Sequence, residues 1–204
     1  KKIYWWEYIK DDNAIEPYFN LMWCISSGDF GVEVKYNYPG KYAENRGSYT
    51  WDPPLKNLAE DIEKLKFREP NVDRGQTMNN LELATEIFGD ILAVRIRGRY
   101  WWTSGLTNDV IKLIGLENLM LYMYDQPEGL HKLMKWMMEE QMYFIEWFEK
   151  NGLLSLQNSD DLFGSGSVGY TDELPQKDFE PGSSVRLKDM WGFSESQETV
   201  GVSP

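Results

Sequence analysis

The sequence predicts an α/β fold, and two of its segments carry that prediction. Residues 91–97 (ILAVRIR) and residues 153–157 (LLSLQ) are short, mostly apolar runs of strand length. Helical patterns fill the chain between them, so the order is strand, helix, helix, strand. Strands joined by such long crossovers pair in parallel with a right-handed connection, and their apolar character is typical of strands covered on both faces.

The N-terminal part differs, and predicts an aromatic-rich extension over residues 1–51 that contains a β-hairpin. Residues 1–24 are expected to form helical pieces. Residues 31–38 alternate apolar with polar side chains, as a half-buried strand does. A Pro-Gly pair then marks a turn before a returning strand within residues 41–51.

Residues 52–204 form the predicted α/β domain, and most of it has helical patterns. Asp52 is the expected N-cap of the first helix. Its apolar stripe consists of Leu55, Leu58, Ile62 and Leu65. Further helices are expected over residues 77–88, from Thr107 to a break at Gly115, over residues 119–124 and over residues 127–150. Residues 185–194 are expected to add a strand.

Charge and composition exclude several classes of function. The chain has 33 acidic and 21 basic residues, a formal net charge of −12, which opposes nucleic-acid and anionic membrane partners. It has no apolar run of about 18 residues and no signal peptide, so we expect a cytoplasmic protein. Cys24 and His131 are its single cysteine and histidine, so we expect no disulfide and no His/Cys metal site in this chain. We interpret Cys24 as a small buried residue and His131 as a surface residue.

Four segments between residues 89 and 204 carry a family pattern. They are GDILAVRIRG, YMYDQPEGLHKLMKWM, LLSLQNSDD and DMWGFSESQETVGVSP. Together they resemble the uroporphyrinogen decarboxylase superfamily. The resemblance implies a TIM-type (β/α)8 barrel, a fold of about 250 residues. We therefore expect the N-terminal part of a barrel, and the helix-start signal Ser203-Pro204 fits a fragment.

The resemblance also implies two activities. The superfamily contains carboxy-lyases that act on tetrapyrrole acids without a cofactor. It also contains methyltransferases that use a corrinoid protein and a zinc ion held by His and Cys in the second half of the barrel. For this chain alone we expect no cofactor and no turnover, and its open sheet edges favour a homodimer or a companion fragment. Gly98-Arg99-Tyr100 matches part of the decarboxylases' arginine-rich motif, but it follows a later strand, so we interpret the match as coincidental.

In a (β/α)8 barrel the site lies where strands end and loops begin. This rule selects a basic and aromatic cluster that follows residues 91–97. Arg97 and Arg99 would hold carboxylate or phosphate groups of a small-molecule substrate, and Trp101 and Trp102 would line its pocket. The alternative is that the arginines pair with acidic residues and the tryptophans fill gaps in the packing.

The same rule selects two further groups of polar residues: Asp160 with Asp161, and the group of Asp189, Glu195, Ser196 and Gln197. Asp160 and Asp161 come shortly after residues 153–157, and two carboxylates at a strand end can share a proton, bind a cation or act as acid and base. Asp161 and Glu195 are the expected catalytic residues, while Asp160 and Gln197 would bind substrate. The alternative is an ordinary loop whose side chains cap turns.

A second hypothesis is a non-catalytic domain for carbohydrate or ligand binding, or for assembly. Aromatic residues make up 15% of the chain. The stripe Trp136, Tyr143 and Trp147 on the predicted helix 127–150 offers a surface for a partner.

Overall fold

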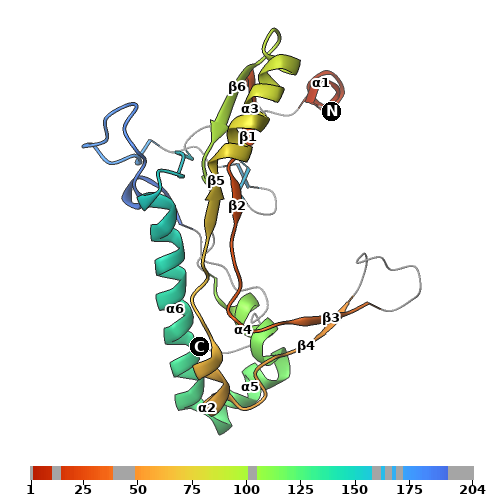
Figure 1. The fold of residues 1–204 in the computed structure, drawn as a ribbon, viewed down its shortest axis with the longest axis vertical. Coiled ribbons are helices and arrows are strands. Elements are labelled where there is room, and N and C mark those ends of the chain that lie inside the picture. The colour runs from red at the N-terminus through yellow and green to blue at the C-terminus, as the bar shows by residue number, and fades with distance from the viewer. Residues whose placement is uncertain are drawn as a thin grey trace. The chain divides into compact units, whose positions relative to one another are not determined.

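The computed structural model describes residues 2–10, 15–38, 49–100, 105–157, 162–163, 167–168 and 172–192. Helices and strands are both present in these residues (Figure 1), which confirms the mixed α/β composition. Contacts within the chain divide it into two units. Unit 1 holds the described residues of 1–26, 71–102 and 145–192, and unit 2 holds those of 27–70 and 103–144. The predicted boundary between residues 51 and 52 stays a prediction.

Unit 1 is built around a parallel pair of strands, β1 (Tyr18–Met22) and β6 (Ala93–Arg97). Tyr18 lies opposite Ala93, and Met22 lies opposite Arg97. A second, antiparallel pair consists of β2 (Cys24–Ser26) and β5 (Asn71–Asp73). Helix α3 (Arg74–Phe88) packs against β1 and β6 (Figure 1), where the rings of Phe19 and Phe88 stack at 4.6 Å.

The helical prediction for residues 1–24 is wrong for β1 and part of β2. Helical structure there is limited to α1 (Lys2–Tyr4) and the π-helix η1 (Trp5–Ile9). Exposure alternates along β1 with the period of a strand. The partner that stabilises β1 is β6, which lies far along the chain, and local sequence patterns do not reveal such a partner.

Helix α3 begins three residues before its predicted start, because Asp73 caps it. The Asp73 carboxylate accepts a hydrogen bond from the backbone N–H of Gln76 at 2.7 Å. Thr77 is fully buried, and its hydroxyl joins two elements: it donates to the Asp73 carbonyl at 2.6 Å and accepts from the Cys24 N–H at 3.0 Å. Gly89 is the C-cap, as predicted. Cys24 is only partly buried.

Unit 2 contains short helices and the longest helix of the described chain. They are α2 (Leu58–Asp61), the 3-10 helix η2 (Ile62–Lys64), α4 (Thr107–Ile114), α5 (Leu116–Asp125) and α6 (Pro127–Lys150), whose last six residues belong to unit 1. Their buried side chains form one core, which includes Leu58, Val110, Leu113, Ile114, Leu133 and Met137. Gly115 separates α4 from α5 as predicted, and α6 has its predicted ends. His131 on α6 is exposed, as expected.

The first helix of this region starts later than predicted. Asp52 is the last residue of strand β4 (Thr50–Asp52) and caps no helix. The N-cap of α2 is Asn57, whose side chain makes no capping hydrogen bond. The Asp61 carboxylate, at the end of α2, accepts hydrogen bonds from the N–H groups of Lys56 at 2.7 Å and Asn57 at 2.8 Å, and so holds the segment that leads into the helix. The predicted stripe is nevertheless correct, since its members are all buried: Leu55, Leu58, Ile62 and Leu65.

The predicted hairpin is present as an antiparallel pair, β3 (Lys35–Asn37) with β4, although both strands are shorter than expected. Tyr36 lies opposite Trp51, and Tyr49 contacts both rings. Trp51 packs on the core, and its indole N–H donates to the carbonyl of Ile111 at 3.4 Å. One end of the hairpin is thereby fixed to unit 2.

A buried ion pair crosses the core of unit 2. The Glu140 side chain is fully buried on α6, and it accepts hydrogen bonds from Arg68 Nε at 2.7 Å and Nη2 at 2.6 Å. The Arg68 guanidinium lies 3.7 Å from the ring centre of Phe144 and 5.0 Å from that of Phe30. This arrangement satisfies both Glu140 oxygens inside an apolar surround.

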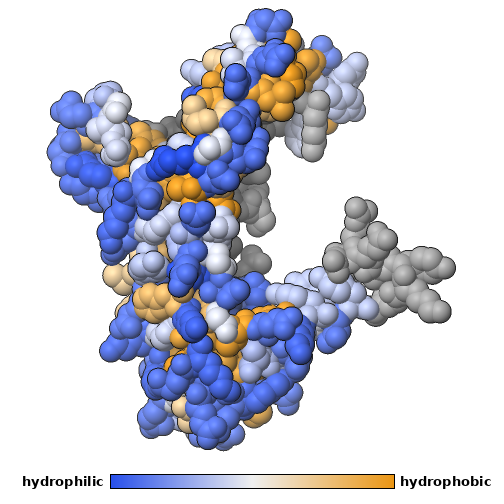
Figure 2. Space-filling view, in the orientation of Figure 1, coloured by the Kyte–Doolittle hydropathy of each residue, from blue (hydrophilic) through white to orange (hydrophobic). Residues whose placement is uncertain are grey.

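The predicted interface stripe on α6 is partly used inside the chain. Trp136 contacts the rings of Phe30 and Phe67, and Tyr143 contacts Phe67. Figure 2 shows hydrophilic side chains over most of one face, with apolar side chains gathered in smaller areas among them. No helix in the described ranges has the length and apolar character needed to cross a bilayer.

Candidate functional site

The best-supported candidate site lies in unit 1, at the carboxyl end of β6. The backbone of Arg99 pairs in parallel with Leu154, since the Arg99 N–H donates to the Leu153 carbonyl at 2.7 Å and the Ser155 N–H donates to the Arg99 carbonyl at 3.0 Å. This bridge confirms the predicted parallel pairing. The expected strand at 153–157 is reduced to that single bridge, although Leu153 and Leu154 are buried as predicted.

Gly98 allows β6 and residues 153–157 to approach each other closely. A Cβ atom at this position would lie 2.4 Å from the Leu153 carbonyl oxygen and 2.7 Å from the carbonyl carbon of Leu154. These are backbone atoms, so a side chain here would require the two segments to separate. The Gly98 N–H also donates to the Ser155 hydroxyl at 2.8 Å.

Arg97 ends β6 and is buried, with 9% of its surface exposed. Its Nη2 donates to the Leu156 carbonyl at 3.2 Å, and its guanidinium carbon lies 3.9 Å from the ring centre of Tyr100. The guanidinium of Arg99 lies 4.9 Å from the ring centre of Phe148. The structure therefore holds both predicted arginines against aromatic rings at the strand end, with Arg97 next to residues 153–157.

Gln157 is a residue of this site that the sequence did not single out. Its side chain is 3% exposed, and its Oε1 accepts a hydrogen bond from the backbone N–H of Trp191. Its Nε2 is buried without a hydrogen-bond partner, and no other buried side-chain atom of the described chain is in that state. A buried amide that lacks an acceptor costs stability, so such a group needs a reason, and a catalytic role, a bound ion and a bound water are among the known ones. The sequence signal that could have identified Gln157 is its place as a polar residue at the end of the apolar run 153–157.

The remaining predicted site residues lie outside the described residues. They are Trp101, Trp102, Asp160, Asp161, Glu195, Ser196 and Gln197. In the sequence, the tryptophans follow Tyr100 directly and the two aspartates follow Gln157 within four residues. Their roles stay predictions.

Asp189, which is close to Glu195 in the sequence, stabilises the local fold through hydrogen bonds of its carboxylate. It is 2% exposed within the 3-10 helix η3 (Leu187–Asp189), where a strand was wrongly predicted. Its carboxylate accepts from Arg186 Nε at 2.6 Å and from the Gln176 N–H at 3.1 Å. Arg186 also binds Asp178 through two hydrogen bonds of 3.0 Å. These bonds close the segment 172–192 on itself.

We expect this segment to loosen in acid. Hydrogen bonds from Arg186, then from Lys188, hold the pKa of Asp178 at about 2, and those from Arg186 lower the pKa of Asp189. Because an unfolded aspartate titrates near pH ~3.9, the stabilisation is complete above that pH and is lost as the pH falls toward 2. Hydrogen exchange of residues 176–191, corrected for intrinsic rates, should show protection falling over this range. An Asp178→Asn variant that kept the full pH dependence would contradict the assignment.

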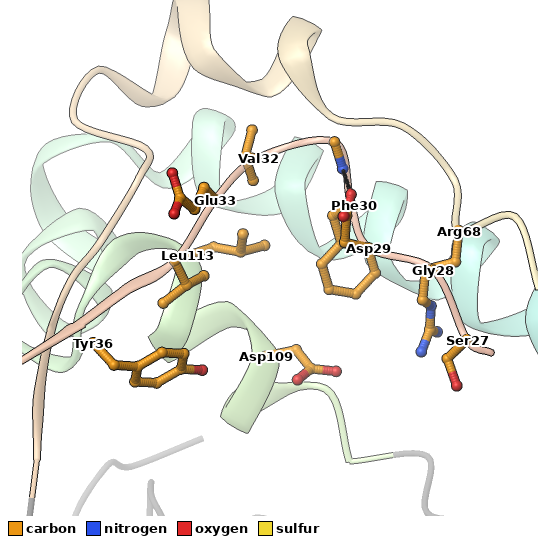
Figure 3. A pocket seen from close by; sticks show the side chains of 12 residues that line it. Ser27, Gly28, Asp29, Phe30, Val32, Glu33, Tyr36, Arg68, Asp109 and Leu113 are labelled. Atoms are coloured by element: carbon orange, nitrogen blue, oxygen red, sulfur yellow. Dashed lines mark hydrogen bonds between the residues drawn. The ribbon is translucent and has the colours of Figure 1, made fainter. Parts of the chain in front are cut away.

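A second candidate site, a groove, lies in unit 2 and was not predicted. It is a groove of about 630 Å³ between the segment 27–36 and α4 (Figure 3). Gly28 shapes its rim, because its φ of +72° is left-handed and a Cβ would lie 2.9 Å from the Glu69 nitrogen. Tyr36 and Asp109 come from β3 and α4, and Figure 3 shows the Tyr36 hydroxyl directed toward Asp109. No clear sequence signal marks the groove, because its lining comes from three separate parts of the chain: residues 27–36, Arg68, and α4.

Comparisons with known proteins assign neither feature. No family model matches the chain, and searches of curated proteins and of solved structures yield no match to it. In the part of the chain that the structure describes, no three His, Cys, Asp or Glu side chains come together as metal ligands would.

Proposed function

We propose that the chain is part of a (β/α)8-barrel enzyme of the uroporphyrinogen decarboxylase type, which binds a carboxylate-bearing substrate at the carboxyl end of β6. One observation carries the proposal. Arg97 and Gln157 are both buried where two neighbouring parallel segments end, and the Gln157 Nε2 has no hydrogen-bond partner among the described residues. In α/β folds, ligands bind in the crevice outside the carboxyl ends of the strands.

The chemistry of these groups fits an anionic substrate. A guanidinium presents several N–H donors in a plane that matches a carboxylate, and its charge is permanent. The Gln157 Nε2 adds a neutral donor whose direction is fixed, because Trp191 holds the amide oxygen. A charged donor and a neutral donor at one strand end favour a ligand with oxygen acceptors. A tetrapyrrole-like acid has such acceptors in the carboxylates of its side chains.

Of the two activities that the resemblance implies, decarboxylation makes more use of this site. A carboxy-lyase must hold the carboxylates that stay on the substrate while one C–C bond breaks, CO₂ leaves and a proton takes its place. Arg97, Arg99 and Gln157 would serve the first task, and Asp161 and Glu195 would handle the proton.

Methyl transfer is the second candidate activity, and the resemblance alone favours it. The resemblance places its zinc ligands, His and Cys, in the second half of the barrel, and this chain has one residue of each type. A cytoplasmic location and a homodimer or a companion fragment complete the proposal.

The test is the binding of uroporphyrin, a fluorescent octacarboxylate, followed by its fluorescence anisotropy. We expect saturable binding that excess tricarballylate displaces. Arg97→Gln should weaken it by about tenfold or more, the effect of losing one charge-assisted contact. Lys177→Gln, which removes an exposed positive charge from the same unit, should change it by less than about twofold. Absence of saturable binding, or equal losses in both variants, would contradict the proposal.

A further inference from the structure

The groove in unit 2 has a fixed apolar floor. Phe30 and Val32 pack against the buried core, and Leu113 of α4 is 1% exposed. Phe30 is also held by the edge of the Trp136 ring, with 5.8 Å between ring centres. Tyr36 at one end keeps 43% of its surface exposed while Tyr49 packs against it at 5.3 Å. The floor and this ring are therefore positioned before any ligand arrives.

The charged groups that line the groove are almost all hydrogen-bond acceptors. Asp29, Glu33 and Asp109 contribute three carboxylates, which accept but do not donate. Arg68 is the one basic residue of the lining, and its Nε and Nη2 both donate to the buried Glu140. The positive charge of Arg68 is thus balanced inside the core and does not neutralise the groove.

The three carboxylates form few hydrogen bonds and ion pairs with the described residues of the protein. Glu33 has no ion-pair or hydrogen-bond partner among the described residues, and the Asp29 carboxylate accepts only from the Gly31 N–H, at 2.8 Å. Asp109 lies 3.3 Å from the ammonium of Lys112, and both side chains are 37% exposed. An exposed pair of this kind contributes little and is readily exchanged.

We propose that this groove binds an organic cation with more than one ammonium group, an oligoamine, at a site separate from the proposed enzyme site. Ammonium groups are pure donors and complement acceptor-only walls, whereas a sugar would need donors from the protein as well. The methylene chain between them would lie on Phe30 and Val32, and Tyr36 would face one ammonium group through its ring. Carboxylates from two sides of the groove, residues 29 and 33 on one and residue 109 on the other, favour a ligand with several charges.

The test is calorimetric titration of the chain with spermidine at low ionic strength. We expect saturable binding that the double variant Glu33→Gln, Asp109→Asn weakens by about tenfold or more, and that Tyr36→Leu also weakens. The matched control is Glu117→Gln, which removes an exposed carboxylate of the same unit outside the groove and should leave binding within about twofold. The replaced side chains are on the surface, and circular dichroism would verify that the fold is kept.

Other outcomes would overturn the proposal. No saturable binding excludes the site. An equal loss in Glu117→Gln would mean attraction to the net charge of −12. Binding of magnesium ions with the same variant dependence would indicate a site for inorganic cations, and binding of maltotriose in place of spermidine would indicate a sugar site. Uroporphyrin binding is measured separately, so either proposal can fail while the other stands.

Discussion

Replacing Glu140 with alanine is expected to destabilise unit 2 by about 3–5 kcal/mol, the largest effect of any substitution considered. The Glu140 side chain is fully buried and receives the Nε and Nη2 hydrogen bonds of Arg68. Its removal leaves the Arg68 guanidinium among Phe30 and Phe144 without a counter-charge. Urea unfolding followed by far-UV circular dichroism measures the loss, since most of α6 lies in this unit.

The matched control removes both charges at once. Arg68→Met combined with Glu140→Leu should cost far less than Glu140→Ala alone, because no unpaired charge then stays in the core. If the double variant were as unstable as the single one, the loss would come from packing and the ion pair would be unimportant.

Gly98→Ala is expected to have the second largest effect, a destabilisation of unit 1 by about 3 kcal/mol, at the upper end of the range for overpacking. The new Cβ would lie 2.4 Å from the Leu153 carbonyl oxygen, so β6 and residues 153–157 would have to move apart. The hydrogen bonds of Arg99 to Leu153 and Ser155 would lengthen or break. The affinity for uroporphyrin should fall as well, because the Arg97 and Gln157 side chains would no longer be held in the same relative positions.

Gly75→Ala in the first turn of α3 is the matched control. A Cβ there would approach nothing closer than 3.5 Å, to an Asp73 oxygen. Alanine favours the helix over glycine by about 1 kcal/mol, so this variant should be as stable as the parent chain or more stable. Equal stability of the Gly98→Ala and Gly75→Ala variants in thermal unfolding would show that the close contact at Gly98 is unimportant.

The elements that the sequence predicts well are those whose signals are local. Helix α6 begins at a proline and is followed by Asn151-Gly152, and its apolar stripe repeats at helical spacing, so nothing outside the helix was needed. Strand β1 is the opposite case, because its partner β6 lies 75 positions along the chain from each of its residues. The first helix of unit 2 falls between these cases. Its apolar stripe is local, but Asp52, the expected cap, pairs in β4 and the helix starts later, after Asn57.

The same distinction explains the sites. Arg97 was predicted because it ends an apolar strand, a pattern visible in five residues. Gln157 was not, because its significance depends on the backbone of Trp191, which binds one end of its amide and leaves the other unpaired. The groove in unit 2 was missed because its three carboxylates come from two segments that are about 80 residues apart and carry no common motif.

The division of the chain into two interleaved units has a consequence for biosynthesis. Unit 1 takes residues from 1–26, 71–102 and 145–192, so a ribosome synthesises the first of these three segments long before the last. The nascent β1, with aromatic residues on its edge, must wait for β6 before it can pair. Pairing between segments that are distant in the sequence slows folding, and until it occurs the unpaired strand is exposed and prone to aggregation with other chains. Holdase chaperones that bind aromatic stretches should therefore associate with translating intermediates that carry β1 but not yet β6, and release them once residue 97 has emerged.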